Sequence, residues 1–384
     1  MTCGKTITQT AVAINFLLVL ALFFFGTIFS EKMEISQQEK RQLANFPKWS
    51  WTLSSLADWP KSLDSYLNDH FFYRESLVFL NALPRVKFLL RSPTSFVLVG
   101  EEGWYFLTGD QALDDYLGRS DKTGVETTAV WEKLITFRQQ QLQKSGANYL
   151  VVVAPNKEPV YSEFLPERIK SNRGTTMLAA LKTRMRNSPM VDHFLDLEEP
   201  LVNAKETGAI YFKTDSHWTG RGAYFAYRAI IEKINHWYPE VVPLSEDRFD
   251  KRPAENPSGG DLVRMMGLVG AIPEKDEERW VMQQPCAEAE DRAVISEILP
   301  AEQSLQVNGC PTGIPLRVLV ISDSFGDGLR DYLSETFRDV VYSFHLPLPE
   351  LQGFIGKYRP HIVLDLRVGR HLPMLMTPGP DERI

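Results

Sequence analysis

The stretch that decides the fold is LRVLVISDSFGDGL, Leu316 to Leu329. Val318 to Ile321 form a continuous apolar run, which is typical of a strand buried on both faces of a parallel sheet. The run enters Ser322-Asp323-Ser324-Phe325, and a turn containing glycine then leads into a predicted helix that ends near Phe337. A strand, a tight turn and a helix in this order predict that Ser324 lies at the carboxyl edge of a sheet, where open α/β sheets place their sites.

Two further runs predict strands of the same sheet. They are NYLVVVAP (Asn148–Pro155) and HIVLDL (His361–Leu366). Helical stretches alternate with them, one that Gly146 ends and another near Thr175–Arg186. We therefore expect an α/β fold with a mainly parallel sheet and helices on both of its faces.

Composition excludes several classes of protein. Hydrophobic residues make up 43% and charged residues 24% of the 384 residues, which is ordinary for a globular protein. The formal net charge is −7, and no Lys/Arg-rich tract, zinc-like cysteine pair, P-loop or GxGxxG motif occurs. We expect no nucleic-acid partner, no metal and no bound cofactor.

The N-terminus predicts a membrane anchor. Ala11 to Phe29 are almost uninterrupted apolar sequence, and a helix of this length spans roughly 29 Å, close to the thickness of a bilayer core. A cleaved signal peptide is the alternative, but Ile28-Phe29-Ser30 is a poor cleavage site. With the N-terminus inside, the remaining chain would lie outside the cytoplasm, where Cys286 and Cys310 could form a disulfide.

The chain is predicted to have three parts. Residues 1–30 are a cytoplasmic tip and transmembrane anchor, 31–95 a helical linker region, and 96–384 the α/β domain. Residues from about 241 to 315 are rich in proline, glycine and acids, so we interpret them as an insertion in that domain.

A second informative stretch is TDSHWTGRGAY, Thr214 to Tyr224. Thr219 is a plausible N-cap for a helix whose apolar residues recur at helical spacing on one face. That face should pack on a core and fix the preceding loop, which carries Asp215 and His217. A serine hydroxyl needs a base to remove its proton, and the base needs an acid to orient it. The sequence therefore offers Ser324, His217 and Asp215 as a triad, the alternative being a structural Asp–His hydrogen bond and a serine that only caps a helix.

Several blocks together resemble the SGNH hydrolase superfamily and, more specifically, the alginate O-acetyltransferase family of AlgX and AlgJ type, with the wider DHHW-like group. The blocks that carry the resemblance are YLNDHFFYR, VGEEGWYFL, VVVAPNKEPVYSEFLP, TDSHWTGRGAY, GGDLVRMMGL, ISDSF and YRPHIVLDLRVGRHL. Simple SGNH enzymes place the serine block before the histidine block, whereas His217 here precedes Ser324. The resemblance thus implies a circularly permuted, flavodoxin-like SGNH hydrolase fold.

The resemblance also implies roles for single residues. Ser324 would be the nucleophile, His217 the base and Asp215 the acid that orients it. The last block lacks the usual oxyanion-hole asparagine, so Arg370 or Arg367 is a candidate substitute. Gly369 precedes Arg370 where the family often has glutamate, and Ser322 stands where it often has glycine.

Other residues are weaker candidates for contact with substrate. Asn156 and Lys157 follow a strand and could touch substrate or support the triad, although Lys157 could equally be a surface lysine. Trp218, beside the predicted base, is the preferred ring for stacking on a sugar, and Trp104 and Tyr224 are further candidates.

The implied function is O-acetylation of an exopolysaccharide such as alginate, in the periplasm of a bacterium, by a protein with a single pass through the inner membrane. A membrane-bound O-acyltransferase would supply the acetyl group. One alternative is an esterase that removes acetyl groups, and another is a polysaccharide-binding or assembly component without activity. The sequence does not name the polymer.

Overall fold

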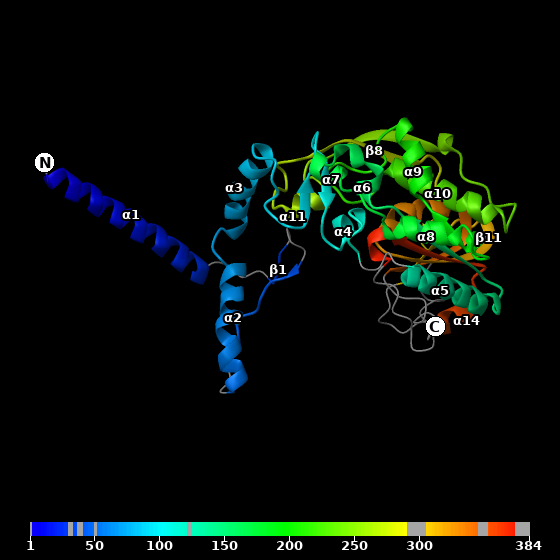
Figure 1. Cartoon of the computed structure of the whole chain (residues 1–384), viewed down its shortest axis with the longest axis horizontal. Helices are drawn as coiled ribbons and strands as arrows, with labels where there is room; N and C mark the ends of the chain where they lie inside the picture. Colours follow the sequence, from blue (N-terminus) through cyan, green and yellow to red (C-terminus); the bar gives the residue numbers. More distant parts are fainter. Residues whose placement is uncertain are drawn as a thin grey trace. The chain divides into compact units, whose positions relative to one another are not determined.

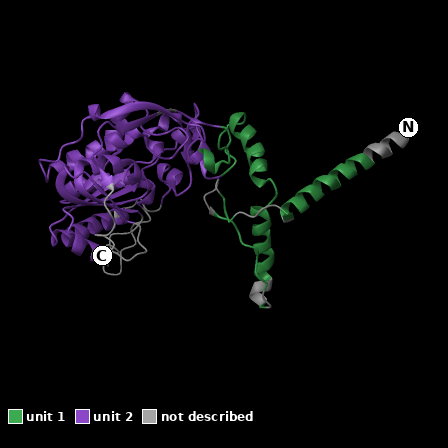
Figure 2. Ribbon diagram, turned by 180° about the vertical axis from the view of Figure 1, so that it is seen from behind, with its two compact units in different colours: residues 1–94, 263–271 green, residues 95–262, 272–384 purple. Residues whose placement is uncertain are grey.

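The computed structural model describes residues 2–29, 34–36, 41–49, 52–120, 125–289, 305–344 and 352–372 (Figure 1). The chain divides into two compact units (Figure 2). Unit 1 comprises residues 1–94 and 263–271, and unit 2 comprises residues 95–262 and 272–384.

Unit 1 is mainly helical. Its helices are α1 (Thr2–Phe29), α2 (Leu53–Asp69) and α3 (Arg74–Lys87), and β1 (Ile35–Ser36) pairs with β2 (Arg41–Gln42). Within α1, Thr10–Thr27 is long and apolar enough to cross a membrane, with a mean hydropathy of 2.2. The predicted apolar N-terminal helix is confirmed, and its role as an anchor stays a prediction.

Unit 2 is built on a seven-stranded sheet in the order β6-β5-β13-β11-β12-β10-β9. The strands are β5 (Asn148–Ala154), β6 (Phe194–Asp196), β9 (Glu288–Ala289), β10 (Leu305–Gly309), β11 (Ile314–Ser322), β12 (Phe337–Phe344) and β13 (Ile362–Val368). The five strands from β6 to β12 run parallel, while β10 is antiparallel to β12 and β9 is antiparallel to β10. The predicted mainly parallel sheet is confirmed.

The order of the parallel strands reveals the permutation directly. If they are counted along the chain from β11, and β5 and β6 are placed after β13, the sheet from β12 to β6 reads 2-1-3-4-5. This is the strand order of flavodoxin-like sheets, which hold their ligands at the switch point between the first and third strands. Here that point lies between β11 and β13, so the turn after β11 occupies the expected place for a site.

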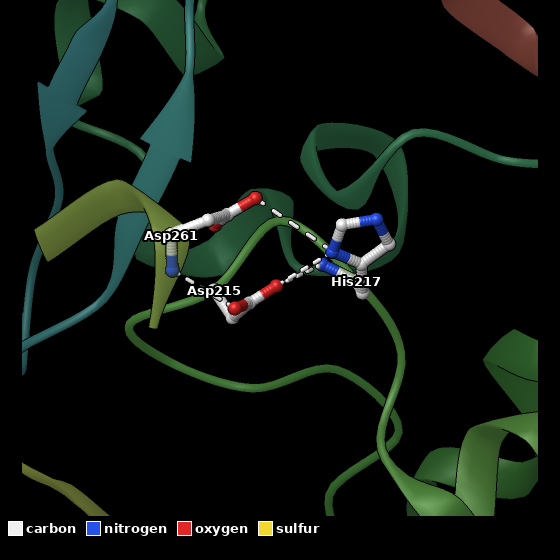
Figure 3. Close-up of side chains that lie close together, drawn as sticks. All are labelled: Asp215, His217 and Asp261. Atoms are coloured by element: carbon white, nitrogen blue, oxygen red, sulfur yellow. Dashed lines mark hydrogen bonds and ion pairs between the residues drawn. The ribbon is translucent and has the colours of Figure 1, made fainter. Parts of the chain in front are cut away.

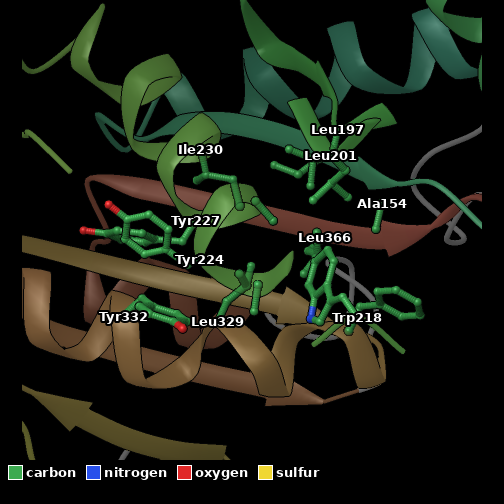
Figure 4. Close-up of a cluster of buried hydrophobic side chains, with 14 of the residues drawn as sticks. Ala154, Leu197, Leu201, Trp218, Tyr224, Tyr227, Ile230, Leu329, Tyr332 and Leu366 are labelled. Carbon is green, nitrogen blue, oxygen red and sulfur yellow. The ribbon is translucent and has the colours of Figure 1, made fainter. Parts of the chain in front are cut away.

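Helices cover both faces of the sheet because successive strand residues point to opposite sides. Val318 and Val320 pack in one core with α9 (Glu198–Ala204), α10 (Gly220–Asn235) and α13 (Arg330–Thr336), part of which is shown in Figure 4. Leu319 and Ile321 pack in the other core with α5 (Val125–Gln143), α8 (Met177–Met185) and α14 (Gln352–Tyr358). The prediction of helices on both faces is also confirmed.

Helix α10 begins as its sequence predicts. The Thr219 hydroxyl accepts a hydrogen bond from the Gly222 N–H at 3.1 Å, which is an N-cap. The apolar stripe of the helix is buried as a whole: Ala223, Ala226, Tyr227, Ile230, Ile231 and Ile234. Each large side chain so buried stabilises the fold by roughly 1.5–3 kcal/mol. A rigid, well-packed helix therefore follows directly after the loop that carries Asp215 and His217.

Smaller elements complete unit 2. One hairpin consists of β3 (Val97–Val99) and β4 (Tyr105–Leu107), and a second joins β7 (Phe249–Asn256) to β8 (Glu274–Met282). The short helices are α4 (Ala112–Tyr116), α6 (Lys157–Val160), α7 (Glu167–Lys170) and α11 (Asp261–Met265), of which the last begins in this unit.

The segment predicted as an insertion, about residues 241–315, contributes β9 and β10 to the central sheet, which the sequence did not indicate. Residues 290–304 of this segment lie outside the described residues. Cys286 and Cys310 form a disulfide.

Candidate active site

Ser324 lies at the first position after the turn that follows β11, where a short 3-10 helix (Ser324–Leu329) begins. The preceding Asp323 fixes this turn, because one carboxylate oxygen accepts the Phe325 N–H at 3.1 Å. Its other oxygen accepts the Val368 N–H at 2.9 Å and faces Nδ1 of His371 at 2.8 Å. Burial would raise the pKa of Asp323, but these hydrogen bonds outweigh it and lower that pKa. Asp323 thus ties the serine turn to the end of β13.

The structure brings the three predicted triad residues into one hydrogen-bonded line. His217 Nε2 lies 2.8 Å from the Ser324 hydroxyl, across 107 residues of sequence. On the other side of the ring, Nδ1 lies 2.7 Å from Asp215 Oδ1, which also accepts the His217 backbone N–H at 3.0 Å. Nδ1 as donor to Asp215 leaves Nε2 as the acceptor for the serine proton, which is the tautomer that a general base requires.

The pKa shifts of Asp215 and His217 also favour a role for His217 as a base. Burial alone would raise the pKa of the Asp215 carboxyl, but the hydrogen bond from His217 outweighs it and lowers that pKa to about 2. Burial favours the neutral imidazole, yet Asp215 and a second carboxylate, Asp261, outweigh it and raise the pKa of His217 above its ordinary value. Asp215 is therefore ionised at neutral pH, and His217 is poised to receive a proton.

Asp261 is a member of the site that the sequence did not single out. Figure 3 shows the carboxylates of Asp215 and Asp261 converging on the same side of the His217 ring, with Asp261 Oδ2 at 3.6 Å from Nδ1. The Asp261 backbone N–H donates to Asp215 Oδ2 at 2.9 Å. Its side chain accepts the Ser216 N–H at 2.7 Å and the Ser216 hydroxyl at 2.5 Å.

The sequence signal for Asp261 was the Gly-Gly pair before it. A Cβ on Gly260 would lie 2.4 Å from the Cβ of Asp215, so only glycine permits this approach. The pair belongs to GGDLVRMMGL, one of the blocks with a resemblance to the alginate O-acetyltransferase family.

Asp215, His217 and Asp261 have ligand atoms within 4.8 Å of one another, which is close enough for a metal ion. Their hydrogen bonds favour another use. Asp215 Oδ1 faces the imidazole, and its Oδ2 accepts a hydrogen bond from the Asp261 N–H. Both oxygens of Asp261 accept hydrogen bonds from Ser216. Because the carboxylate oxygens already face hydrogen-bond donors, the cluster is better suited to positioning the imidazole and its proton than to binding a metal ion.

Lys157 and Asn156 lie beneath the site. The Lys157 ammonium donates to the backbone carbonyls of Asp215 at 2.9 Å and Lys213 at 3.1 Å. Its side chain is buried, so the alternative of a surface lysine is wrong, and burial lowers its pKa to about 8. The Asn156 side-chain oxygen Oδ1 accepts a hydrogen bond from the Arg370 backbone N–H at 3.1 Å. Both residues therefore support neighbouring backbone, and neither is placed as a substrate contact.

The two candidate arginines differ in their surroundings. Arg367 is held in a buried ion pair with Asp365 at 2.8 Å, which removes it from the site. The Arg370 guanidinium lies over the Phe325 ring at 5.6 Å, next to the serine turn, and its Nε has no partner among the described residues. The buried Glu158 carboxyl likewise has one oxygen, Oε1, without a partner in the described part of the chain. Of the two arginines, only Arg370 remains a candidate.

The three aromatic candidates are core residues in the structure. Trp218, which is labelled in the core cluster of Figure 4, is 4% exposed. Its ring packs edge-on against Phe325, with ring centroids 4.9 Å apart. Trp104 is 4% exposed and stacks with the rings of Tyr161 and Phe164. Tyr224 is 3% exposed, and its hydroxyl donates to the Leu244 backbone carbonyl. The expectation that Trp218 stacks on a sugar therefore needs correction, because its ring faces are covered by protein.

A comparison with known protein families identifies the family of this chain. Residues 97–342 match the family model described as an SGNH hydrolase-like domain of the acetyltransferase AlgX. The chain belongs to this family. The expected AlgX/AlgJ resemblance is thereby confirmed, together with the SGNH hydrolase-like fold.

Curated relatives of this AlgX-family protein include probable alginate O-acetylases AlgJ. The protein from Pseudomonas syringae pv. tomato is 25% identical over 233 residues, which cover 59% of this chain and 56% of that protein. The one from Pseudomonas aeruginosa is 24% identical over 176 residues, covering 45% and 41%. The chain thus spans about half the length of the curated relatives it matches.

Similar solved structures include the O-acetyltransferase domain of Pseudomonas putida AlgJ, with a TM-score of 0.45 and 18% identity over 74% of this chain and 96% of that one. Bacillus cereus PatB1 has a TM-score of 0.49 and 16% identity, covering 72% and 96%.

Proposed function

We propose that this protein is an extracytoplasmic polysaccharide O-acetyltransferase that works through an acetyl ester on Ser324. The observation that carries the proposal is the continuous line of hydrogen bonds from the Ser324 hydroxyl through His217 to Asp215. Membership of a family described as acetyltransferases, and relatives named alginate O-acetylases, favour acetyl as the group and an alginate-like polymer as the acceptor.

The proposed reaction has two halves. His217 Nε2 takes the proton of Ser324 as its oxygen attacks the acetyl carbonyl, and then gives that proton to the departing donor group. A sugar hydroxyl next loses its proton to His217 and attacks the acetyl-serine, and the proton returns to the Ser324 oxygen as it leaves. Asp215 stabilises the imidazolium in each half.

Two groups are candidates for stabilising the oxyanion that forms when the acetyl carbonyl is attacked. Ser324 begins a 3-10 helix whose Phe325 and Gly326 N–H groups already donate to Asp323, so the backbone candidate is the N–H of Ser324 itself. Arg370 lies over the Phe325 ring, beside this turn, and offers a cation. One donor of this kind contributes about 3–4 kcal/mol to the rate of acyl transfer.

The proposed location rests on two features. The apolar span Thr10–Thr27 would anchor the chain in the inner membrane with one pass. The Cys286–Cys310 disulfide favours an oxidising compartment such as the periplasm for unit 2. We further propose that a membrane-bound O-acyltransferase delivers the acetyl group to Ser324 at this surface.

The test uses the full-length protein in detergent with a chromogenic acetyl ester, with and without alginate oligosaccharide. We expect release of the chromophore, one added acetyl group on Ser324 by intact mass, and acetylated sugar when acceptor is present. Ser324→Ala should lose all three, whereas Ser171→Ala, at an exposed serine, should keep them. Undiminished turnover by Ser324→Ala would refute the triad assignment.

An esterase is the second candidate, because the His217 side chain is 30% exposed and water can therefore reach the site. Turnover to free acetate at the same rate with and without oligosaccharide would favour this alternative. Binding of oligosaccharide without any turnover would instead favour a non-catalytic role.

A further inference from the structure

Helix α3 has an apolar face that nothing in the described structure covers. Leu77, Leu80, Pro84 and Phe88 are exposed and recur at the spacing of a single helical stripe. Leu80 is 66% and Phe88 80% exposed, and Leu89 and Leu90 directly after them are equally open. The opposite face already buries Ala82 and Val86, so the packing of unit 1 does not explain the exposed stripe.

Positive charge surrounds the end of this stripe. Arg85 and Lys87 lie in the last turn of α3, and Arg91 follows the exposed leucines. Glu75, in the first turn, is the one acidic residue of the helix. Exposed large apolar side chains with lysine and arginine between them match the boundary of a bilayer, where the apolar groups enter the acyl region and the cations meet phosphate headgroups.

The beginning of α3 is joined to the end of the apolar span. The Phe72 N–H donates to the Thr27 hydroxyl at 3.1 Å, and Thr27 is the last residue of that span. The Phe71 ring stacks on Phe23 with centroids 5.2 Å apart. If α1 crosses the membrane, as in the proposed function, α3 begins at the level where α1 leaves it.

We propose that the exposed stripe of α3, with Phe88 to Leu90, lies in the surface of an anionic phospholipid bilayer. The apolar side chains enter the lipid, and Lys87 and Arg91 bind its phosphate groups. A protein partner covering the same stripe is the competing occupant, which an experiment in pure lipid can exclude.

The experiment places a fluorescent label at Phe88→Cys or Leu80→Cys in the full-length chain with Cys3→Ser. The protein is reconstituted into vesicles of phosphatidylethanolamine and phosphatidylglycerol that carry nitroxide-bearing lipids. We expect blue-shifted emission and several-fold stronger quenching at both positions than at Val242→Cys, which is 59% exposed in unit 2. The double variant Lys87→Glu and Arg91→Glu should weaken the quenching at residue 88.

Quenching at residues 80 and 88 no stronger than at residue 242 would overturn the proposal. The proposal also fails if the labels leave water only after another membrane protein is added to the vesicles. Neither outcome depends on acetyl transfer, so this test stands apart from that of the enzyme activity.

An independent observation concerns Asp261 and rests on the proposed acyl transfer. Asp261 binds the two residues that precede His217. Its carboxylate accepts hydrogen bonds from the backbone and side chain of Ser216, and its N–H donates to Asp215 Oδ2. We infer that Asp261 is a positioning residue that fixes the Asp215–His217 loop against Ser324, and that its negative charge stabilises the imidazolium.

The charged groups that act on His217 are few. Asp215 and Asp261 face Nδ1 at 2.7 and 3.6 Å and raise the pKa of the imidazole, while the positive charge of Arg370 lowers it. Asp261→Asn keeps the backbone donor and an oxygen acceptor for Ser216 but removes the charge. Asp261→Ala removes the side-chain contacts as well.

The measurements are the pH profile of kcat/KM and the titration of His217 by NMR. For Asp261→Asn we expect the His217 pKa and the acid limb to fall by roughly one pH unit. For Asp261→Ala we expect about a 10²-fold loss of kcat, because the loop loses its register. Asp331→Asn, at an exposed aspartate, is the control.

An unchanged His217 titration in Asp261→Asn would overturn the charge assignment, and undiminished kcat in Asp261→Ala would overturn the positioning role. If the wild-type protein shows no turnover at all, the proposed function fails. The NMR titration still decides the role of the Asp261 charge in that case.

Discussion

Replacement of Glu158 by glutamine should make the stability of the protein less sensitive to a rise in pH from 5 to 8.5. Glu158 lies in α6, is 1% exposed and has no partner for Oε1 among the described residues. Burial raises the pKa of its carboxyl from 4.5 to about 7, although Arg370 and Lys157 oppose this shift. The folded protein therefore favours the protonated acid, and ionisation of the buried group costs free energy.

The sign of the pH dependence follows from proton binding. Between the unfolded pKa of 4.5 and the folded pKa of about 7, the folded state binds more protons, so the free energy of unfolding falls as pH rises. The stability that the protonated Glu158 carboxyl contributes is fully present below pH 4.5 and is lost once pH passes about 7. A shift of this size corresponds to roughly 3 kcal/mol.

The assay is thermal unfolding of full-length Glu158→Gln and wild-type protein in detergent at pH 5 and pH 8.5. A glutamine amide left without partners costs about 1–3 kcal/mol, but at both pH values alike, so the diagnostic quantity is the change in the Tm difference between them. At about 2–4 °C per kcal/mol, that change should be several degrees in favour of glutamine at the higher pH.

Glu240→Gln, at an exposed glutamate, supplies the matched control and should show no such change. The same Tm difference at both pH values in Glu158→Gln would refute the reasoning.

Three further predictions concern the active site and the disulfide. Gly260→Ala would place a Cβ 2.4 Å from that of Asp215 and against backbone of the same loop, so we expect about a 10²-fold loss of kcat/KM and a lower Tm, whereas Gly353→Ala, with open space around it, should be neutral. Reduction of Cys286–Cys310, which closes a loop of 24 residues, should lower the free energy of unfolding by roughly 3 kcal/mol in denaturant titrations. The acid limb of kcat/KM should lie above pH 6.5, because His217 has a raised pKa and cannot act as a base once protonated; a limb below that value would contradict the hydrogen-bonded triad.

The sequence predicted the parts of the fold that repeat a local pattern. The runs in β5, β11 and β13 are apolar because both sheet faces are covered, and Thr219 begins a helix with one continuous apolar stripe. Strands β9 and β10, at one end of the sheet, were missed, because they are short and lie in a polar segment whose pairing depends on the distant β12.

The sequence predicted those site residues that lie close together in the chain or next to a recognisable strand or helix. Asp215 and His217 are two residues apart at the start of a helix, and Ser324 follows a clear strand. Asp261 was missed because its role depends on contact across 46 residues, made possible by a glycine and not by the acid itself. Trp218 was misassigned because proximity to His217 in sequence says nothing about which way a ring points, and here it points into the core.

The order of strands also governs when the candidate site can be completed during synthesis. At the centre of the sheet β5 pairs with β13, and there the Tyr149 hydroxyl bonds to Asp365, 216 residues later. Contacts of such long range form slowly. Strand β5 therefore stays without its partner β13 until the C-terminal part of the chain has been synthesised. His217, the proposed base, is synthesised well before Ser324, the proposed nucleophile, which lies 107 residues later. A chain interrupted before β11 therefore lacks the centre of the sheet and Ser324, the residue on which the proposed acetyl ester would form.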